Sequence, residues 1–348
     1  MTELTHIDGS YGEGGGQIIR TALSLSAITG KAIEITQIRA KRAKPGLQPQ
    51  HLTAVHITGD LCAARLEGAA VGSTRLLFTP QAPVAAGNYR RDIGTAGAIA
   101  LVIQTALLPL ALRDQPSHVL LIGGTHVNHA PSSDYLETVY LPALRRLGVE
   151  AQMSCPRAGF FPRGGGDVLL DIMPTAGLRP LDLTERGKLR KITAIITTSG
   201  LPSHVAERGA ATVTSEINKI GLGRDLTVEQ REKPSNGPGA AVLLAVECDN
   251  GHAGFSALGE RGKPMERVAE EACRDFHAWW QTGATCDEHL ADQLVLPLAL
   301  ANAESRWTTP TCTEHLRTVI WLVEQLLPVN LTVTEQTPGQ HLVVLRPR

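Results

Sequence analysis

The chain has 348 residues, of which 43% are hydrophobic and 4% aromatic, and its 33 Lys and Arg against 34 Asp and Glu give a formal net charge of −1. This length allows a substantial core and two domains. The balanced charge argues against a dedicated duplex-DNA-binding protein, and the few aromatic residues argue against an extended base-stacking surface. Any nucleic acid is therefore expected to bind locally, as a substrate.

The six cysteines are scattered and form no C-x-x-C pair. This predicts reduced thiols, not a zinc site or a disulfide framework, and favours a cytoplasmic location. No basic stretch followed by an apolar core stands at the start of the sequence, so we expect no secretory signal peptide. The most apolar stretch, 98–112, is too short to span a bilayer and predicts a buried helix, and we expect no membrane contact.

Helix-like and strand-like segments alternate along the whole chain, which predicts an α/β or α+β fold. The predicted helices cover 18–26, 49–66, 98–112, 135–147, 209–220, 264–280, 285–303 and, near the end, 316–327. The predicted strands cover 32–38, 75–79, 118–122, 168–172, 192–198, 241–247, 254–258, 329–334 and 341–345.

Two features bear on domain organisation. The glycine-rich segment 11–16 is echoed by 161–166, which indicates either repeated βα units or, for the second copy, a plain strand entry. From about residue 186 the sequence pattern changes: a basic stretch leads into a self-contained set of predicted strands and helices. This set covers roughly a hundred residues, the size of a small domain, and the earlier pattern returns after it. We therefore predict an inserted small α/β domain at 186–283, within a large domain formed by 1–185 and 284–348.

The segment 8–51 combines a glycine loop with a basic cluster. Glu13 stands among the glycines, an apolar run with helical spacing follows, and Arg39, Lys41, Arg42 and Lys44 come after it. Glycine allows the backbone to approach a ligand, and loop amides before a helix favour anions. A carboxylate near an arginine cluster suggests metal and phosphate binding together. The alternative is a surface turn followed by a solvated basic loop.

A second candidate site lies at the start of the last helix. The residues around 316–327 give one apolar helix face, and Thr311 with Glu314 has the spacing of a capping box. This places His315 in the first helical turn, where the positive end of the helix lowers the pKa of an imidazole and keeps it neutral and nucleophilic at pH 7. The alternative is an ordinary surface histidine at a helix start.

Other polar residues allow two interpretations each. Asp292 either accepts a hydrogen bond from a ligand or faces water, and Gln104 is either a buried, satisfied amide or a ligand contact. His126 and His129 could suggest a metal site, but the pair lies in a loop-like stretch and metal ligation there is not expected.

The motifs in this sequence closely resemble those of the RNA 3′-terminal phosphate cyclases. The resemblance extends over most of the chain, in shared order and spacing, and is carried by the segments 12–20, 38–47, 50–52, 123–125, 204–208, 290–294 and 315–316. It implies a large domain of repeated βα units with four-stranded sheets and a smaller inserted α/β domain. The family uses ATP and Mg²⁺ or Mn²⁺ to convert an RNA 3′-phosphate end to a 2′,3′-cyclic phosphate.

The resemblance also implies residue roles. His315 matches the nucleophile that forms a covalent histidine–AMP intermediate, from which AMP passes to the RNA 3′-phosphate. Glu13 matches a metal-coordinating glutamate. The residues matching the phosphate and RNA-end site are Arg20, Arg39, Arg42, Gln50 and His51. The positions around the adenosine are matched by Gln104, Pro131 and Asp292, together with His289. The expected partners are ATP and an RNA with a 3′-phosphate end, and no obligate protein partner is inferred.

The sequence departs from the family pattern at three positions. His289 stands where related bacterial enzymes carry a tyrosine, His126 replaces an acidic or amide residue, and Ser132 replaces a second proline. Two alternatives also stay open. Non-catalytic ribosome-assembly relatives share the fold but lack the nucleophile, and enolpyruvyl transferases share the repeated βα architecture.

Overall fold

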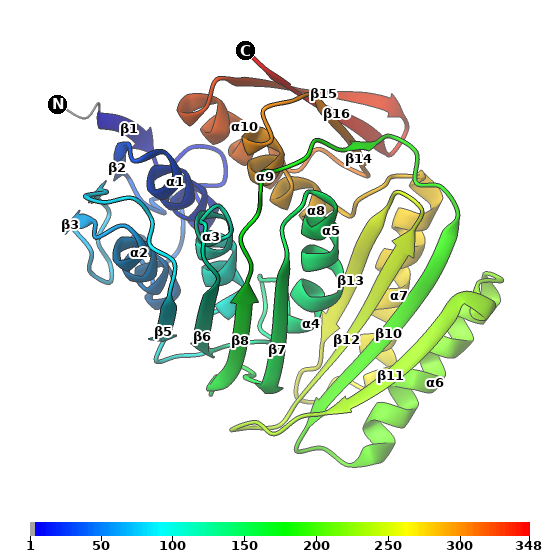
Figure 1. Ribbon diagram of the computed structural model, residues 1–348. Helices are drawn as coiled ribbons and strands as arrows, with labels where there is room; N and C mark the ends of the chain where they lie inside the picture. Colours follow the sequence, from blue (N-terminus) through cyan, green and yellow to red (C-terminus); the bar gives the residue numbers. More distant parts are fainter. Residues whose placement is uncertain (1–3) are drawn as a thin grey trace.

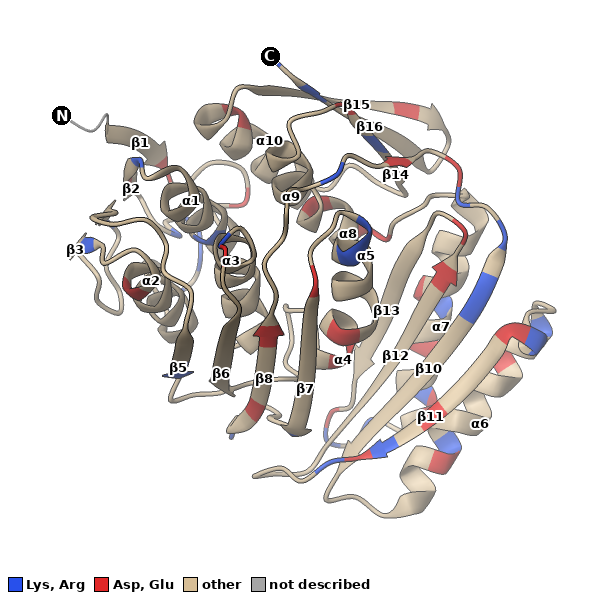
Figure 2. Ribbon diagram, viewed as in Figure 1, with Lys and Arg blue, Asp and Glu red and all other residues tan. Residues whose placement is uncertain are grey.

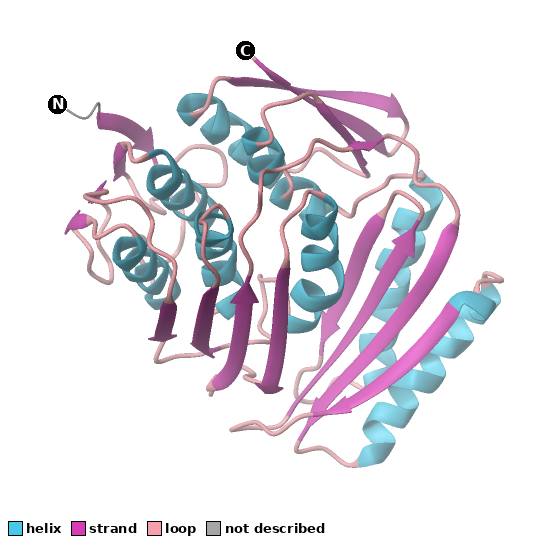
Figure 3. Ribbon diagram, viewed as in Figure 1, coloured by secondary structure: helices cyan, strands magenta, loops and turns pink. Residues whose placement is uncertain are grey.

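The computed structural model describes residues 4–348. Within them, sixteen strands form four four-stranded sheets, and helices pack against these sheets (Figures 1 and 3). The predicted mixed α/β class is thus confirmed. Helix α1 (Gly16–Thr29) packs on α2 (Pro49–Leu61), α3 (Ile99–Ala111) and α10 (Glu314–Leu326), and α2 packs on α3, because each buries an apolar face in a single large core.

The first two sheets have the same topology. In each, the first strand runs parallel to the second, the third and fourth strands are antiparallel, and the spatial order is first, second, fourth, third. The first comprises β1 (Leu4–Asp8), β2 (Ala32–Thr36), β3 (Arg65–Glu67) and β4 (Leu76–Thr79), with helices α1 (Gly16–Thr29) and α2 (Pro49–Leu61). The second comprises β5 (Asn88–Asp92), β6 (Ser117–Gly123), β7 (Ala151–Arg157) and β8 (Gly166–Ile172), with α3 (Ile99–Ala111), α4 (Ser133–Tyr135), a π-helical segment (Leu136–Tyr140) and α5 (Leu141–Arg146).

The repeated topology is real, but the two glycine triplets are not equivalent within it. Gly16 begins α1, directly after the first strand of its repeat, whereas Gly166 begins β8, the last strand of its repeat. The second triplet is therefore the strand entry that the sequence offered as the alternative.

The third sheet has a different strand order and its own hydrophobic core. Its elements are β10 (Leu189–Ser199), β11 (Leu226–Glu232), β12 (Gly239–Cys248) and β13 (His252–Leu258), with α6 (Ser203–Lys219), α7 (Met265–Thr282) and a short 3₁₀ turn (Gly223–Asp225). Helices α6 and α7 lie on one face of this sheet (Figure 1). These elements fall inside the predicted limits 186–283, and the division into two domains stays a prediction.

The fourth sheet ends the chain and carries the last helices. Its elements are β9 (Asp182–Leu183), β14 (Ser305–Thr309), β15 (Val329–Thr337) and β16 (Gln340–Pro347), with α8 (Glu288–Gln293), α9 (Val295–Leu300) and α10 (Glu314–Leu326). The predicted helix 285–303 is broken at Leu294, because Pro297 has no N–H to donate to the carbonyl of Gln293.

Two further local predictions are corrected. The predicted helix 49–66 ends at Leu61, and the following residues form β3. The cap of α10 is Thr313, not Thr311: its hydroxyl accepts the backbone N–H of Leu316 at 3.0 Å. Because the helix still starts at Glu314, His315 keeps its predicted place in the first turn.

Charges of both signs are interspersed over the ribbon, in keeping with the near-zero net charge (Figure 2). Five of the six cysteines are buried, and Cys312 is partly exposed. In the part of the chain that the structure describes, no helix has the length and apolar character needed to cross a bilayer.

Candidate active site

His315 is the second residue of α10, and its side chain is 45% exposed. Burial lowers the pKa of the ring below its ordinary value, and the charges of Arg20 and Arg42 act in the same direction, while Glu13 opposes them. The ring is therefore neutral at pH 7. A neutral imidazole at the start of a helix can act as a nucleophile toward a phosphate group that the helix end attracts.

The glycine loop between β1 and α1 lies directly against α10. The Tyr11 ring stacks on Trp321, with ring centroids 4.0 Å apart and planes 11° from parallel. A Cβ on Gly12, whose φ is +55°, would lie 2.4 Å from the Thr318 hydroxyl. The Glu13 carboxylate lies 3.0 Å from His315 Nε2. Loop residues 11, 12 and 13 thus face Trp321, Thr318 and His315, which stand three residues apart on one face of α10.

The basic segment approaches the same loop. Arg42 Nη2 lies 2.7 Å from Glu13 Oε2, so this carboxylate bridges Arg42 and His315. Arg39 has a left-handed backbone (φ +53°), and its guanidinium donates to the carbonyl of Lys44 at 2.7 Å. Arg42 therefore faces the glycine loop, whereas the side chain of Arg39 stabilises the basic segment itself by bonding to the Lys44 carbonyl.

Gln50 and His51 lie at the start of α2. The side chain of Gln50 accepts the backbone N–H of Ala98 at 3.0 Å, which joins the starts of α2 and α3. His51 is buried, and its Nδ1 accepts the backbone N–H of Gln48 at 3.1 Å. Burial, with the charges of nearby arginines, lowers the pKa of His51 to about 3. A Cβ on Gly16 would lie 2.2 Å from His51 Nε2, so this position requires glycine.

A cavity of about 680 Å³ opens beside His315. Six of the predicted site residues line it, namely Arg20, Gln104, Pro131, His289, Asp292 and His315, whereas the cavity lining does not include Glu13, Arg39, Arg42, Gln50 and His51. The predicted residues therefore form two groups, one that lines the cavity and one around the glycine loop. The contact between His315 and Glu13 connects these two groups.

Several cavity groups are poised to bind a polar ligand. The side-chain Nε2 of Gln104 is buried and has no hydrogen-bond partner in residues 4–348. Burial raises the pKa of Asp292 to about 7, and burial lowers the pKa of Arg20 to about 10. An unsatisfied buried amide costs free energy unless a ligand pairs with it, which favours a polar ligand at this place.

The opposite wall of the cavity was not predicted from the sequence. It comes from the sheet β10–β13 and its helix α7, with Phe255, Ser256 and Trp279 among the lining residues. Asp287 fixes this wall to α8, because its carboxylate accepts the backbone N–H of Gly254 at 2.9 Å and the hydroxyl of Tyr135 at 3.0 Å. In the sequence, Phe255 and Trp279 occupy positions typical of the core face of a strand and of a helix. Their spacing therefore does not predict that they line a cavity.

Two of the three departures from the family pattern have a local structural role. The hydroxyl of Ser132 caps α4 by accepting the backbone N–H of Tyr135 at 3.1 Å, and His126 Nε2 lies 2.9 Å from the buried carboxylate of Asp134. His289 lines the cavity with an exposed side chain. Among the residues described, no three His, Cys, Asp or Glu side chains gather in a way that could hold a metal ion.

The model of the RNA 3′-terminal phosphate cyclase family matches residues 11–333 of this chain. The chain belongs to that family. The family match begins in the glycine loop and extends past α10, so it includes every residue of the site described above.

Individual relatives agree with this assignment. A protein of Nostoc punctiforme named RNA 3′-terminal phosphate cyclase is 45% identical over 338 residues, which cover 95% of this chain and 97% of the relative. A protein of Methylococcus capsulatus with the same name is 46% identical, covering 98% of this chain and 96% of the relative. The enolpyruvyl transferase NikO of Streptomyces tendae superimposes with a TM-score of 0.37 at 8% identity, over 99% of this chain and 48% of that one. This chain thus spans about half the length of NikO, and a likeness at that level carries no argument on activity.

Proposed function

We propose that this protein converts an RNA 3′-phosphate end to a 2′,3′-cyclic phosphate at the expense of ATP, with His315 as the nucleophile. The observation that carries the proposal is the position of the His315 ring, which contacts the glycine loop through Glu13 and lines the same cavity as Gln104 and Asp292. Membership of the cyclase family supports the overall reaction.

In the first step, the lone pair of the neutral imidazole attacks the α-phosphorus of ATP. An N–P bond forms as the bond to the bridging oxygen breaks, and pyrophosphate leaves with that electron pair. The lowered pKa of His315 supports this role, because a protonated ring has no free lone pair. The unpaired amide of Gln104 and the carboxylate of Asp292 are groups that can hydrogen-bond the adenosine.

Arginines near the glycine loop would hold the phosphates. Arg42 faces the loop and Arg20 lines the cavity next to His315, so both can bind phosphate oxygens and stabilise charge in the transfer. Glu13 is a single, partly exposed carboxylate, and this suits Mg²⁺ or Mn²⁺, since Mg²⁺ is often held by one or two carboxylates together with substrate phosphates. Such an ion would neutralise triphosphate charge.

In the second step, an oxygen of the RNA 3′-phosphate attacks the phosphorus of the His315 adduct. The N–P bond breaks and the imidazole leaves, so that AMP is now joined to the RNA end through a P–O–P bond. The neighbouring 2′-OH then attacks the 3′-phosphorus, loses its proton and displaces AMP. Because only RNA offers a 2′-OH, a DNA end would stop at the adenylate. A cytoplasmic location fits an enzyme of RNA ends and remains part of this proposal.

The test is to incubate the protein with α-labelled ATP and Mg²⁺. An acid-labile, alkali-stable protein–AMP adduct is expected for the wild type and absent for His315→Ala. His118→Ala serves as the control, because this exposed histidine pairs with Asp171 and does not line the cavity. Equal labelling of His315→Ala would exclude His315 as the nucleophile. Labelling of neither protein, together with binding to pre-ribosomal particles, would favour the non-catalytic alternative.

A further inference from the structure

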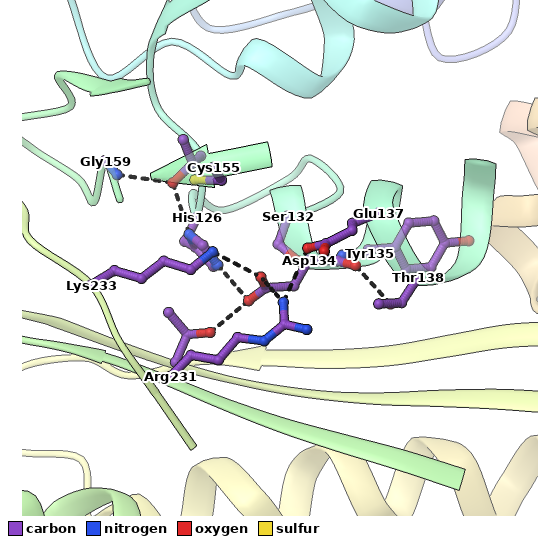
Figure 4. Close-up of polar contacts among 12 residues, drawn as sticks. His126, Ser132, Asp134, Tyr135, Glu137, Thr138, Cys155, Gly159, Arg231 and Lys233 are labelled. Carbon is purple, nitrogen blue, oxygen red and sulfur yellow. Dashed lines mark hydrogen bonds and ion pairs between the residues drawn. The ribbon is translucent and has the colours of Figure 1, made fainter. Parts of the chain in front are cut away.

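A buried carboxylate joins the cavity to the sheet β10–β13. Asp134, 2% exposed, stands in α4 and accepts hydrogen bonds from both sides (Figure 4). From the cavity side, His126 Nε2 lies 2.9 Å from Oδ2. From the sheet, the hydroxyl of Thr197 in β10 donates at 2.6 Å, Arg231 Nη1 at the end of β11 at 3.2 Å, and Lys233 Nζ at 3.3 Å.

On the cavity side, these contacts close a loop. His126 and Asp134 stand at the two ends of the segment 127–133, and the backbone N–H of Ser133 also donates to the carbonyl of Thr125 at 2.8 Å. The residues between them, including Asn128 and Pro131, line the cavity. The ring of His126 is held in turn by the hydroxyl of Thr125 at 2.8 Å. Asp134 thus fixes the base of a loop that forms part of the cavity wall.

On the sheet side, the same carboxylate holds the strands that lead to the opposite wall. Thr197 of β10 is paired with Ala241 of β12, and Leu243 of β12 is paired with Ser256 of β13, which lines the cavity. Two strand pairings therefore separate Asp134 from that wall. One side chain is in contact with both the loop and the sheet, and the cavity lies between them.

The charges around Asp134 require it to be ionised. Burial alone would raise the pKa of this carboxyl, but the hydrogen bond from His126 and the charge of Lys233 lower it below the ordinary value. Lys233 is 13% exposed, so its ammonium would lose a paired anion in the interior if Asp134 were neutral. A buried ion pair that loses one partner leaves an uncompensated charge, and the structure around it must move.

We infer that Asp134 is a positioning residue that sets the distance between the two walls of the nucleotide cavity, and so the affinity for ATP, without touching the ligand. This inference rests on the proposed use of the cavity for ATP. It assigns to Asp134 an effect mainly on nucleotide binding and little on the attack by His315, because the side-chain contacts of Asp134 include neither His315 nor Glu13, which holds the His315 ring.

The test compares Asp134→Asn with Glu137→Gln. Glu137 is the matched control, since it pairs with the same Arg231 at 3.0 Å but is 36% exposed and does not line the cavity. We expect Asp134→Asn to raise the ATP concentration for half-maximal adenylation about tenfold, while the rate at saturating ATP changes less than about threefold. Glu137→Gln should stay within about twofold of the wild type in both measurements.

Thr197→Val removes a single hydrogen bond from the same carboxylate and retains the shape of the side chain, so it serves if Asp134→Asn does not fold. A rise of about threefold in the half-maximal ATP concentration is expected. The inference is overturned if Asp134→Asn, or Thr197→Val in its place, lowers the saturated rate with an unchanged ATP requirement. It is also overturned if Glu137→Gln raises the ATP requirement as much as Asp134→Asn does. These results differ from a failure of the proposed function, in which the wild type itself forms no adduct.

Discussion

Replacing Trp321 by leucine should slow the proposed attack of His315 on ATP without weakening ATP binding. Trp321 lies six residues after His315 in α10 and is stacked on Tyr11 of the glycine loop, while the same loop brings Glu13 to His315. A stacked aromatic pair is worth about 0.5–1.5 kcal/mol beyond the area it buries. If this energy holds the loop in register with α10, its loss slows adenylation by about 2- to 12-fold.

The assay is single-turnover formation of the protein–AMP adduct at saturating labelled ATP, with the ATP dependence measured in parallel. Trp321→Phe is the matched variant, because a phenyl ring can still stack on Tyr11, and it should recover most of the rate. Wild-type adenylation by Trp321→Leu would refute the argument that the stack positions His315. An equal loss in both variants would show that the size of the indole matters and the stacking does not.

Four further outcomes are expected. Glu13→Gln should raise the Mg²⁺ concentration for half-maximal adenylation by about tenfold or more, as measured by metal titration, and an unchanged requirement would remove Glu13 from the metal site. Because burial lowers the pKa of His315 below its ordinary value of 6.5, the saturated adenylation rate should fall to half only below pH 6.5, whereas half-loss at or above pH 6.5 contradicts this. Because the pKa of Asp292 is raised from 3.8 to about 7, its ionisation disfavours folding increasingly as the pH rises from about 4 to 7; Asp292→Asn should therefore raise the Tm at about pH 8 but not at about pH 4. Phe276→Ala should lower the free energy of unfolding in urea by about 3–5 kcal/mol, and a loss below about 1 kcal/mol would show that the core around α7 rearranges.

The elements with a clear hydrophobic period could be predicted from the sequence. The apolar residues of α1 and α10 recur at helical spacing, and both helices stand close to their predicted places. Strands such as β5 (Asn88–Asp92) and β11 (Leu226–Glu232) were missed, because these edge strands are largely polar and none of their residues is buried. Their place in a sheet follows from backbone pairing with β6 and β10, which local sequence does not reveal.

The residues of the candidate site also form two groups, those that could be predicted from the sequence and those that could not. Glu13 and His315 stand in local motifs, a glycine loop and a helix start, and could be chosen from the residues alone. Phe255 and Trp279 could not, since they look like core residues and reach the cavity only because the sheet β10–β13 packs beside it. The Asp134 contacts were missed for a related reason, as its partners Thr197 and Arg231 lie 63 and 97 residues further along the chain.

The partial exposure of Cys312 gives the chain a built-in attachment point for a reporter group. This thiol lies three residues before His315, and the preceding Pro310 and Thr311 line the cavity, whereas the other five cysteines are buried. A maleimide fluorophore should therefore react at one place, beside the cavity proposed to bind the nucleotide. Because burial raises the pKa of the Cys312 thiol, the coupling calls for mildly alkaline buffer, and the labelled protein would then signal the arrival of ATP optically with no engineered cysteine.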